Sequence, residues 1–110
     1  KMRRHDKRNK PRSAHVRHIL VGHKPEAREI IEQITNAKNP LRMFKKLAKK
    51  YSNCPSGAKK GDLGEFIEGQ MAVDFETAVW ATDIDQTPSK FVKTQFGYHI
   101  IWVHSKTEHQ

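Results

Sequence analysis

The 110-residue chain has a single cysteine, no long apolar run and few acidic residues in its first half. One cysteine excludes an internal disulfide and the zinc-finger patterns, which need several metal-binding side chains at fixed spacing. No apolar run approaches the ~20 residues that a membrane-spanning helix requires, so no membrane span is expected. The basic first twelve residues lack a following apolar segment, so we do not expect a secretory signal there. The length suits one domain with a modest core.

Charge is distributed unevenly along the chain. Residues 1–60 carry 18 Lys and Arg against 4 Asp and Glu, and residues 61–110 carry 3 against 8; the resulting +14 and −5 sum to +9. Such a basic chain suggests binding to nucleic acid or another polyanion, although a basic arm can equally be a linker or a solubilising tail. The candidate polyanion-binding residues are Lys1, Arg3, Arg4, Lys7, Arg8, Lys10, Arg12, Lys45 and Lys49.

Hydrophobic periodicity predicts an alternation of strands and helices. The β-branched run 15–21 favours a strand, and Pro25 is a suitable first residue for a helix. Asn39 and Pro40 are typical of the start of a second helix, and a third is expected from about Asp74. Three more strands are predicted at 63–67, 91–95 and 98–104, the last two forming a hairpin around Gly97. The apolar helix positions expected to face the core are Ala27, Ile30, Ile31, Ile34, Leu41, Phe44, Leu47, Ala48, Tyr51, Phe75, Ala78 and Val79.

The predicted order β-α-α-β-α-β-β, with strands at both ends, favours an α+β fold with a mainly antiparallel sheet. We expect a flexible basic arm or linker over 1–13, one domain over 14–105 and a short tail over 106–110. Because the first residue is lysine, the chain is compatible with a fragment of a longer protein.

Two kinds of site are disfavoured by spacing. His15 and His18 lie three apart on a predicted strand, so their side chains point to opposite faces and cannot hold one metal ion. The stretch GAKKGDLG lacks the G-x-x-x-x-G-K-[ST] pattern of a phosphate-binding loop. Neither a metal nor a cofactor is therefore expected.

Cys54, in 51-YSNCPSG-57, has several interpretations. It could be a packed thiol, or the nucleophile of a Cys–His hydrolase. The sequence around it does not match the local signature of a cysteine protease, and the chain is short for one.

A set of motifs in order resembles the parvulin family of peptidyl-prolyl cis/trans isomerases. The resemblance runs from about His15 to Val103 and is carried by HVRHILV, YSNCPSG, GDLGEF, GQM, FETAV and TQFGYHII. Each motif alone is weak, but the set at compatible spacing is specific. The chain is most similar to bacterial-type single-domain members that are not phospho-specific. The resemblance implies a four-stranded antiparallel sheet surrounded by helices.

The resemblance also implies a site. Its apolar pocket for the substrate proline would consist of Leu63, Met71, Phe75 and Phe96, and its polar catalytic floor of His18, Cys54, Thr94 and His99. Leu, Met and two Phe suit a prolyl ring, although the same residues could be ordinary core. His18 and His99 could likewise be hydrogen-bonded core histidines. Cys54 would then act on the rotating carbonyl electrostatically rather than as a nucleophile.

The expected function is acceleration of rotation about X–Pro bonds in protein or peptide substrates, without phospho-specificity. Only Gly22, His23 and Lys24 separate the first strand from the first helix, which leaves no room for a phosphate-binding arginine cluster. The alternative is a module that binds proline-containing peptides or nucleic acid with little turnover. We expect a monomer in the cytoplasm or nucleus.

Overall fold

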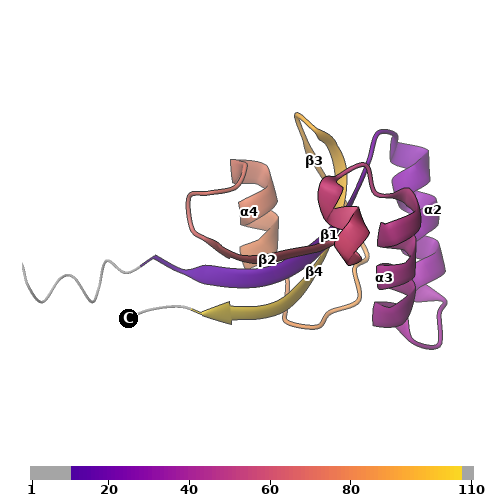
Figure 1. Cartoon of the computed structure of the whole chain (residues 1–110), viewed down its shortest axis with the longest axis horizontal. Helices are drawn as coiled ribbons and strands as arrows, with labels where there is room; N and C mark the ends of the chain where they lie inside the picture. The colour runs from indigo at the N-terminus through magenta and orange to yellow at the C-terminus, as the bar shows by residue number, and fades with distance from the viewer. Residues whose placement is uncertain (1–10, 108–110) are drawn as a thin grey trace, which may run out of the picture.

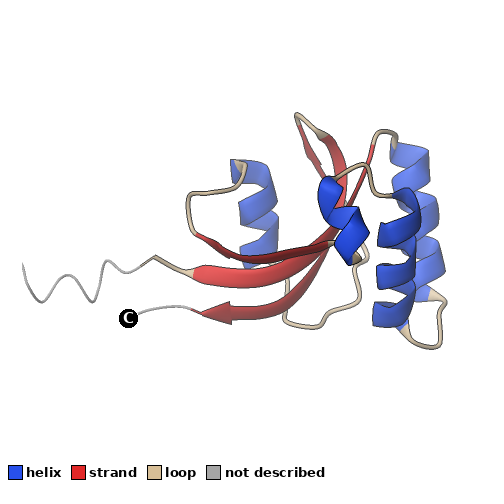
Figure 2. Cartoon of the chain, viewed as in Figure 1, coloured by secondary structure: helices blue, strands red, loops and turns tan. Residues whose placement is uncertain are grey.

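The computed structural model describes residues 11–107, and the order of its elements confirms the predicted α+β architecture (Figures 1 and 2). A short 3-10 helix, η1, is the one element that the sequence did not predict. The elements are β1 (Ser13–Val21), α2 (Lys24–Thr35), α3 (Pro40–Tyr51), η1 (Pro55–Lys59), β2 (Asp62–Ile67), α4 (Val73–Trp80), β3 (Val92–Thr94) and β4 (Gly97–Thr107).

The four strands form one sheet in the order β2-β1-β4-β3, and all neighbours are antiparallel. β1 pairs with β4 along its whole length, from Ser13 opposite Thr107 to Val21 opposite Tyr98, with a register shift between His15 and Val16. The predicted hairpin around Gly97 is confirmed as β3–β4, although β3 is only three residues long. The first and last strands of the domain therefore lie side by side at the centre of the sheet.

Each face of the sheet supports its own core, with α4 on one face and the pair α2 and α3 against the other (Figure 1). Side chains alternate along β1, so Ile19 and Val21 pack with α2 and α3 while Ala14 and Val16 lie on the α4 side. His18 shares the parity of Val16, and this places a histidine on the α4 side of the sheet. The α4 side is therefore where a polar site can form.

α3 begins and ends as its sequence indicates. Asn39 caps it by accepting a hydrogen bond from the Arg42 N–H at 3.1 Å, and Pro40 occupies the first turn. The prediction that Tyr51 faces the core is wrong, because its exposed fraction is 38%. Tyr51 is the last helical residue, so no further turn carries it over the core, and the Lys50 ammonium lies 5.2 Å from its ring.

Residues 81–91, between α4 and β3, are hydrogen-bonded to β4. The Asp85 N–H donates to the Val103 carbonyl at 2.7 Å, and the Trp102 indole donates to the Asp85 carboxylate at 3.2 Å. Trp102 also packs edge-on against Phe44 in the α2 and α3 core. A wide loop is thus held against the part of β4 that β3 leaves unpaired. Within residues 11–107, no helix combines the length and the apolar character needed to cross a membrane.

Candidate active site

Two buried histidines meet on the α4 side of the sheet. In the register of β1 and β4, His18 lies opposite Ile101 and His99 opposite Leu20, so the two rings are diagonal neighbours on one face. Their Nδ1 atoms are 3.0 Å apart, and the rings stack at 5.1 Å with an interplanar angle of 19°. The pairing expected from the sequence is present.

Thr94 continues this network from β3. Its hydroxyl lies 2.6 Å from His99 Nε2 and accepts a hydrogen bond from the Phe96 N–H at 3.1 Å. The Thr94 hydroxyl can use both its donor and its acceptor capacity only if it donates to His99. His99 then donates through Nδ1 to His18, which leaves the buried His18 Nε2 as a donor without a partner among the described residues. We infer this proton order from complementarity.

Burial keeps both rings neutral. Desolvation lowers the pKa of His18 from 6.5 to about 4, and the proximity of His99 adds to the shift. Burial likewise lowers the pKa of His99. Neither ring is therefore a cation at neutral pH, and the pair forms a polar surface of fixed hydrogen bonds rather than a positive charge.

Acidification from pH 7 to pH 4.5 is expected to lower the free energy of unfolding by about 2–3 kcal/mol through His18. The native pKa of about 4 lies below the ordinary 6.5, so within that window the unfolded chain binds a proton that the native protein does not. Stability is therefore complete above pH 6.5 and is lost as the pH falls towards 4. Urea unfolding at both pH values measures the difference.

His18→Gln should remove most of this pH dependence, whereas His23→Gln, at an exposed position, should leave it intact. The lowered pKa values of His99 and His104, and those of the Asp62 and Glu68 carboxyl groups, contribute to what remains. An undiminished pH dependence in His18→Gln would show that this ring is not the buried titrating group.

Phe75 of α4 covers the histidine pair. Its ring lies edge-on to His18 at 5.6 Å and to His99 at 5.2 Å, and its exposed fraction is only 2%. Leu63 and Met71 pack at the margin of the same apolar cluster. The β1–β2 register shifts between Val16 and Arg17, and such a bulge can turn a side chain out of strict alternation. We attribute the position of Leu63 on the α4 side to this bulge.

Phe96 is placed differently from the other three predicted pocket residues. It lies in the β3–β4 turn with an exposed fraction of 65%, and no ring contact joins it to Phe75. Its backbone N–H bonds to Thr94, so the turn is fixed although the ring is exposed. The structure thus brings Leu63, Met71 and Phe75 together, with Phe96 on an adjoining turn.

Cys54 lies immediately before η1 and is partly buried. Its nearest hydrogen-bond partner is the Ser56 hydroxyl, which donates to Sγ at 3.2 Å, and no hydrogen bond links Sγ to either histidine. Ser52 accepts a hydrogen bond from the Cys54 N–H at 3.3 Å. The sequence did not single out Ser52 or Ser56, although both lie in the quoted YSNCPSG motif.

The segment around Cys54 is pinned to β1 beside His18. The Leu20 N–H donates to Ser52 Oγ at 3.0 Å, and the Asn53 N–H donates to the Leu20 carbonyl at 2.7 Å. At the far end of η1, the His18 N–H donates to the Gly61 carbonyl at 2.9 Å. The thiol is therefore held next to the strand that carries His18.

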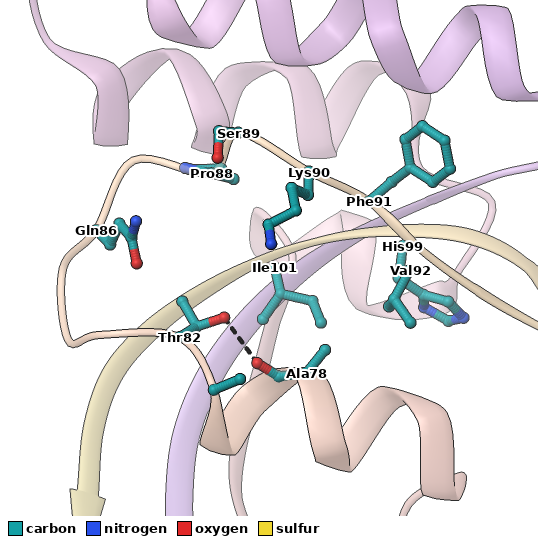
Figure 3. Close-up of a pocket in the computed structure, with 11 residues that line it drawn as sticks. Ala78, Thr82, Gln86, Pro88, Ser89, Lys90, Phe91, Val92, His99 and Ile101 are labelled. Atoms are coloured by element: carbon teal, nitrogen blue, oxygen red, sulfur yellow. Dashed lines mark hydrogen bonds between the residues drawn. The ribbon is translucent and has the colours of Figure 1, made fainter.

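A cleft of about 320 Å³ lies between the end of α4, the segment after it and β4 (Figure 3). Thr82 and Ala78, joined by a 2.7 Å hydrogen bond, form one wall, and Lys90 and Phe91 lie opposite. Of the described residues that line this cleft, His99 alone belongs to the predicted site. Leu63, Met71, Phe75 and Phe96 do not line it. The cleft therefore adjoins the histidine pair from the β3 side and is distinct from the predicted proline pocket.

The predicted polyanion-binding residues are dispersed. Lys45 and Lys49 line a basic groove along α3. Arg12 forms an ion pair with Glu68 at 3.0 Å and lies over the Trp80 ring at 4.3 Å. The other six residues, Lys1, Arg3, Arg4, Lys7, Arg8 and Lys10, lie outside the described residues. Within 11–107, no group of three or more His, Cys, Asp or Glu is arranged to hold a metal ion.

The arrangement suits a reaction that forms no bond to the substrate. An apolar surface beside neutral, fixed hydrogen-bonding groups can hold a small ring and disfavour a polar, planar amide next to it. The fold and the site together define the parvulin class of rotamase domains.

Comparison with known proteins identifies the family. Residues 1–107 match the family model described as the PPIC-type PPIase domain, so the chain belongs to the PPIC-type peptidyl-prolyl cis–trans isomerase family. It is 40% identical over 94 residues to foldase protein PrsA 4 of Bacillus cereus, a match covering 84% of this chain and 32% of that protein.

Solved structures of peptidyl-prolyl isomerases have the same fold as this chain. The crystal structure of the peptidylprolyl isomerase PrsA from Bacillus anthracis has a TM-score of 0.80 at 36% identity, covering 100% of this chain and 48% of that one. The solution structure of NmPin, the parvulin of Nitrosopumilus maritimus, has a TM-score of 0.70 at 35% identity, covering 84% of this chain and 96% of that one. The chain spans about a third of the length of the curated relatives it matches.

Proposed function

We propose that this domain accelerates cis/trans rotation about X–Pro bonds in protein substrates by binding the twisted amide without covalent chemistry. The observation that carries the proposal is the neutral His18–His99 pair, hydrogen-bonded to Thr94 and covered by Phe75. Peptidyl-prolyl isomerase is the activity named by the family, and foldase and isomerase are the names of the relatives.

The energetic requirement is modest. Rotation about the X–Pro bond has a barrier of about 20 kcal/mol because amide resonance must be broken. Lowering it by about 5 kcal/mol accelerates exchange several thousandfold. An enzyme achieves this by binding the twisted state more tightly than either planar isomer.

Each part of the site has a role in this proposal. Leu63, Met71 and Phe75 hold the proline ring, so that the preceding carbonyl is the part that rotates. The low-dielectric surroundings disfavour the planar amide, whose resonance separates charge. The histidine pair and Thr94 keep the floor of the site rigid and uncharged. Cys54 acts as a weakly polar neighbour of the carbonyl.

The proposed substrates lack phosphate before proline. Only Gly22 and His23 lie between the end of β1 and the start of α2, so no loop is available there to carry an arginine cluster. A dianionic phosphate would need several such donors to offset its loss of water.

Cys54→Ser is expected to keep kcat/KM within about tenfold of the parent, because the proposed mechanism needs a small polar atom and not a nucleophile. Cys54→Asp should also remain active. Protease-coupled isomerisation of an Ala-Pro peptide measures both. Loss of more than about a thousandfold in both variants, with the fold intact by circular dichroism, would indicate covalent catalysis instead.

A further inference from the structure

A groove of about 450 Å³ runs along α3, and every residue that lines it is a cation. Five of these residues come from α3 and the sixth follows η1; they are Arg42, Lys45, Lys46, Lys49, Lys50 and Lys60. Within residues 11–107, none of the six forms an ion pair with a carboxylate. We call this surface the basic groove.

The cations of the basic groove repel one another. Those of α3 recur at spacings of three and four residues, so they lie on one face. The effective dielectric constant at a concave surface is lower than in bulk water, which strengthens the field inside the groove. An anion that enters it therefore relieves repulsion as well as gaining attraction.

The short helix η1 connects the basic groove to Cys54. α3 and η1 lie side by side (Figure 1). Lys60 directly follows η1 and precedes Gly61, whose carbonyl is bonded to His18. Cys54 lies at the other end of η1, and five residues of 3-10 helix span about 10 Å. An extended chain covers this distance in about three residues.

We propose that the basic groove binds an acidic stretch of the same polypeptide whose proline occupies the active site. This inference rests on the proposed isomerase function and adds a substrate preference to it. The α3 cations from Arg42 to Lys50 span about 12 Å, which matches about four extended residues. The preferred substrates therefore carry a short run of Asp or Glu that begins about three residues from the proline.

Two observations favour a polypeptide over a nucleic acid as the occupant. Among residues 11–107, no aromatic side chain lines the basic groove, whereas single-stranded nucleic acids are usually held by base stacking on aromatic rings. The groove also lies one short helix, η1, away from Cys54, so one chain can reach both the groove and the proposed site. Duplex DNA, which can bind through phosphate contacts alone, is a distinguishable competitor.

The test uses matched peptides that contain one Ala-Pro bond, a three-residue Gly-Ser spacer and four Glu or four Gln residues, with the run on either side of the proline. For one orientation, the Glu peptide is expected to have a KM about tenfold lower than the Gln peptide at low salt, with kcat unchanged, as four exposed ion pairs would give. Lys45→Gln/Lys49→Gln removes two of the six cations and should reduce the difference to about threefold. A proline tetrapeptide without the Glu or Gln run should show the same kinetics with the parent protein and with the double variant.

Arg28→Gln/Lys38→Gln removes the same charge from exposed positions outside the groove and should preserve the preference. An equal loss of the Glu preference in this control would show that net charge, and not the groove, sets the preference. Equal KM values for the Glu and Gln peptides with the parent protein would overturn the inference. Duplex DNA that binds through Lys45 and Lys49 when the Glu peptide does not would assign the groove to nucleic acid.

Fluorescence anisotropy with the same peptides carrying alanine in place of proline separates the inference from the proposed function. Tighter binding of the Glu peptide that depends on Lys45 and Lys49, without turnover of any proline peptide, would reject the isomerase proposal and keep the basic groove as a binding site for acidic peptides. Turnover of the proline peptides without a Glu preference in binding or KM would keep the isomerase proposal and reject the acidic-peptide site.

Discussion

Replacing Gly61 by alanine is expected to lower the free energy of unfolding by about 3–5 kcal/mol. Gly61 has a φ of 84°, and a Cβ there would lie 2.6 Å from the His18 carbonyl oxygen and 3.1 Å from Ala48 Cβ. The first of these neighbours is backbone at the centre of the sheet and cannot move away cheaply. The clash would also separate Gly61 from the His18 N–H that it binds, so activity should fall with stability.

Gly64→Ala is the matched control. Gly64 also has a positive φ, of 72°, but a Cβ there would meet nothing within 4 Å. This variant carries the backbone strain without the clash, and a cost of about 1–2 kcal/mol is expected. Urea unfolding of the two variants isolates the effect of close approach. Equal losses would show that Gly61 is retained for its conformation alone.

Phe75→Ala should lower kcat/KM by about 10–100-fold, because the proposed site would lose the ring that covers the His18–His99 pair. The same change should cost about 3–5 kcal/mol of stability, since Phe75 is almost fully buried. Activity should therefore be measured at a temperature where circular dichroism shows the variant to be folded.

Phe44→Ala distinguishes the pocket from the core. Phe44 is fully buried on the opposite face of the sheet, so its removal should cost similar stability and change kcat/KM of the folded protein by less than about threefold. Phe75→Leu, which keeps much of the apolar volume, should recover most of the stability and part of the activity. Equal activity losses in Phe44→Ala and Phe75→Ala would show that Phe75 acts only through packing.

The sequence was sufficient to predict the regular elements because their signals are local. The spacing of Ala27, Ile30 and Ile34 predicted α2, and all three are buried as expected. Asn39 and Pro40 predicted the start of α3 in the same way. The turn at Gly97 predicted the hairpin, and Gly97 indeed has a φ of 137°.

The site was harder to predict, because its contacts join residues far apart in the chain. The resemblance to a family supplied the pairing of His18 with His99, which periodicity alone could not. The partner of Cys54 is the local Ser56 hydroxyl, whose orientation depends on η1, an element too short to leave a periodic signal. Phe96 lies in the β3–β4 turn, and its exposed fraction of 65% has no signal in the local sequence. The charge distribution predicted that Lys45 and Lys49 bind polyanions, but it did not predict that they line one groove with Lys60.

Exchange NMR of cis/trans isomerisation, with and without the domain, tests the central claim most directly. The substrates are X-Pro peptides with Ala, Leu, Arg, Glu or phosphoserine as X. Uncatalysed exchange takes tens of seconds. The account predicts clear acceleration for Ala, Leu and Arg and no gain from phosphoserine over Glu. Unchanged exchange rates for every peptide, in the presence of a folded domain, would contradict it.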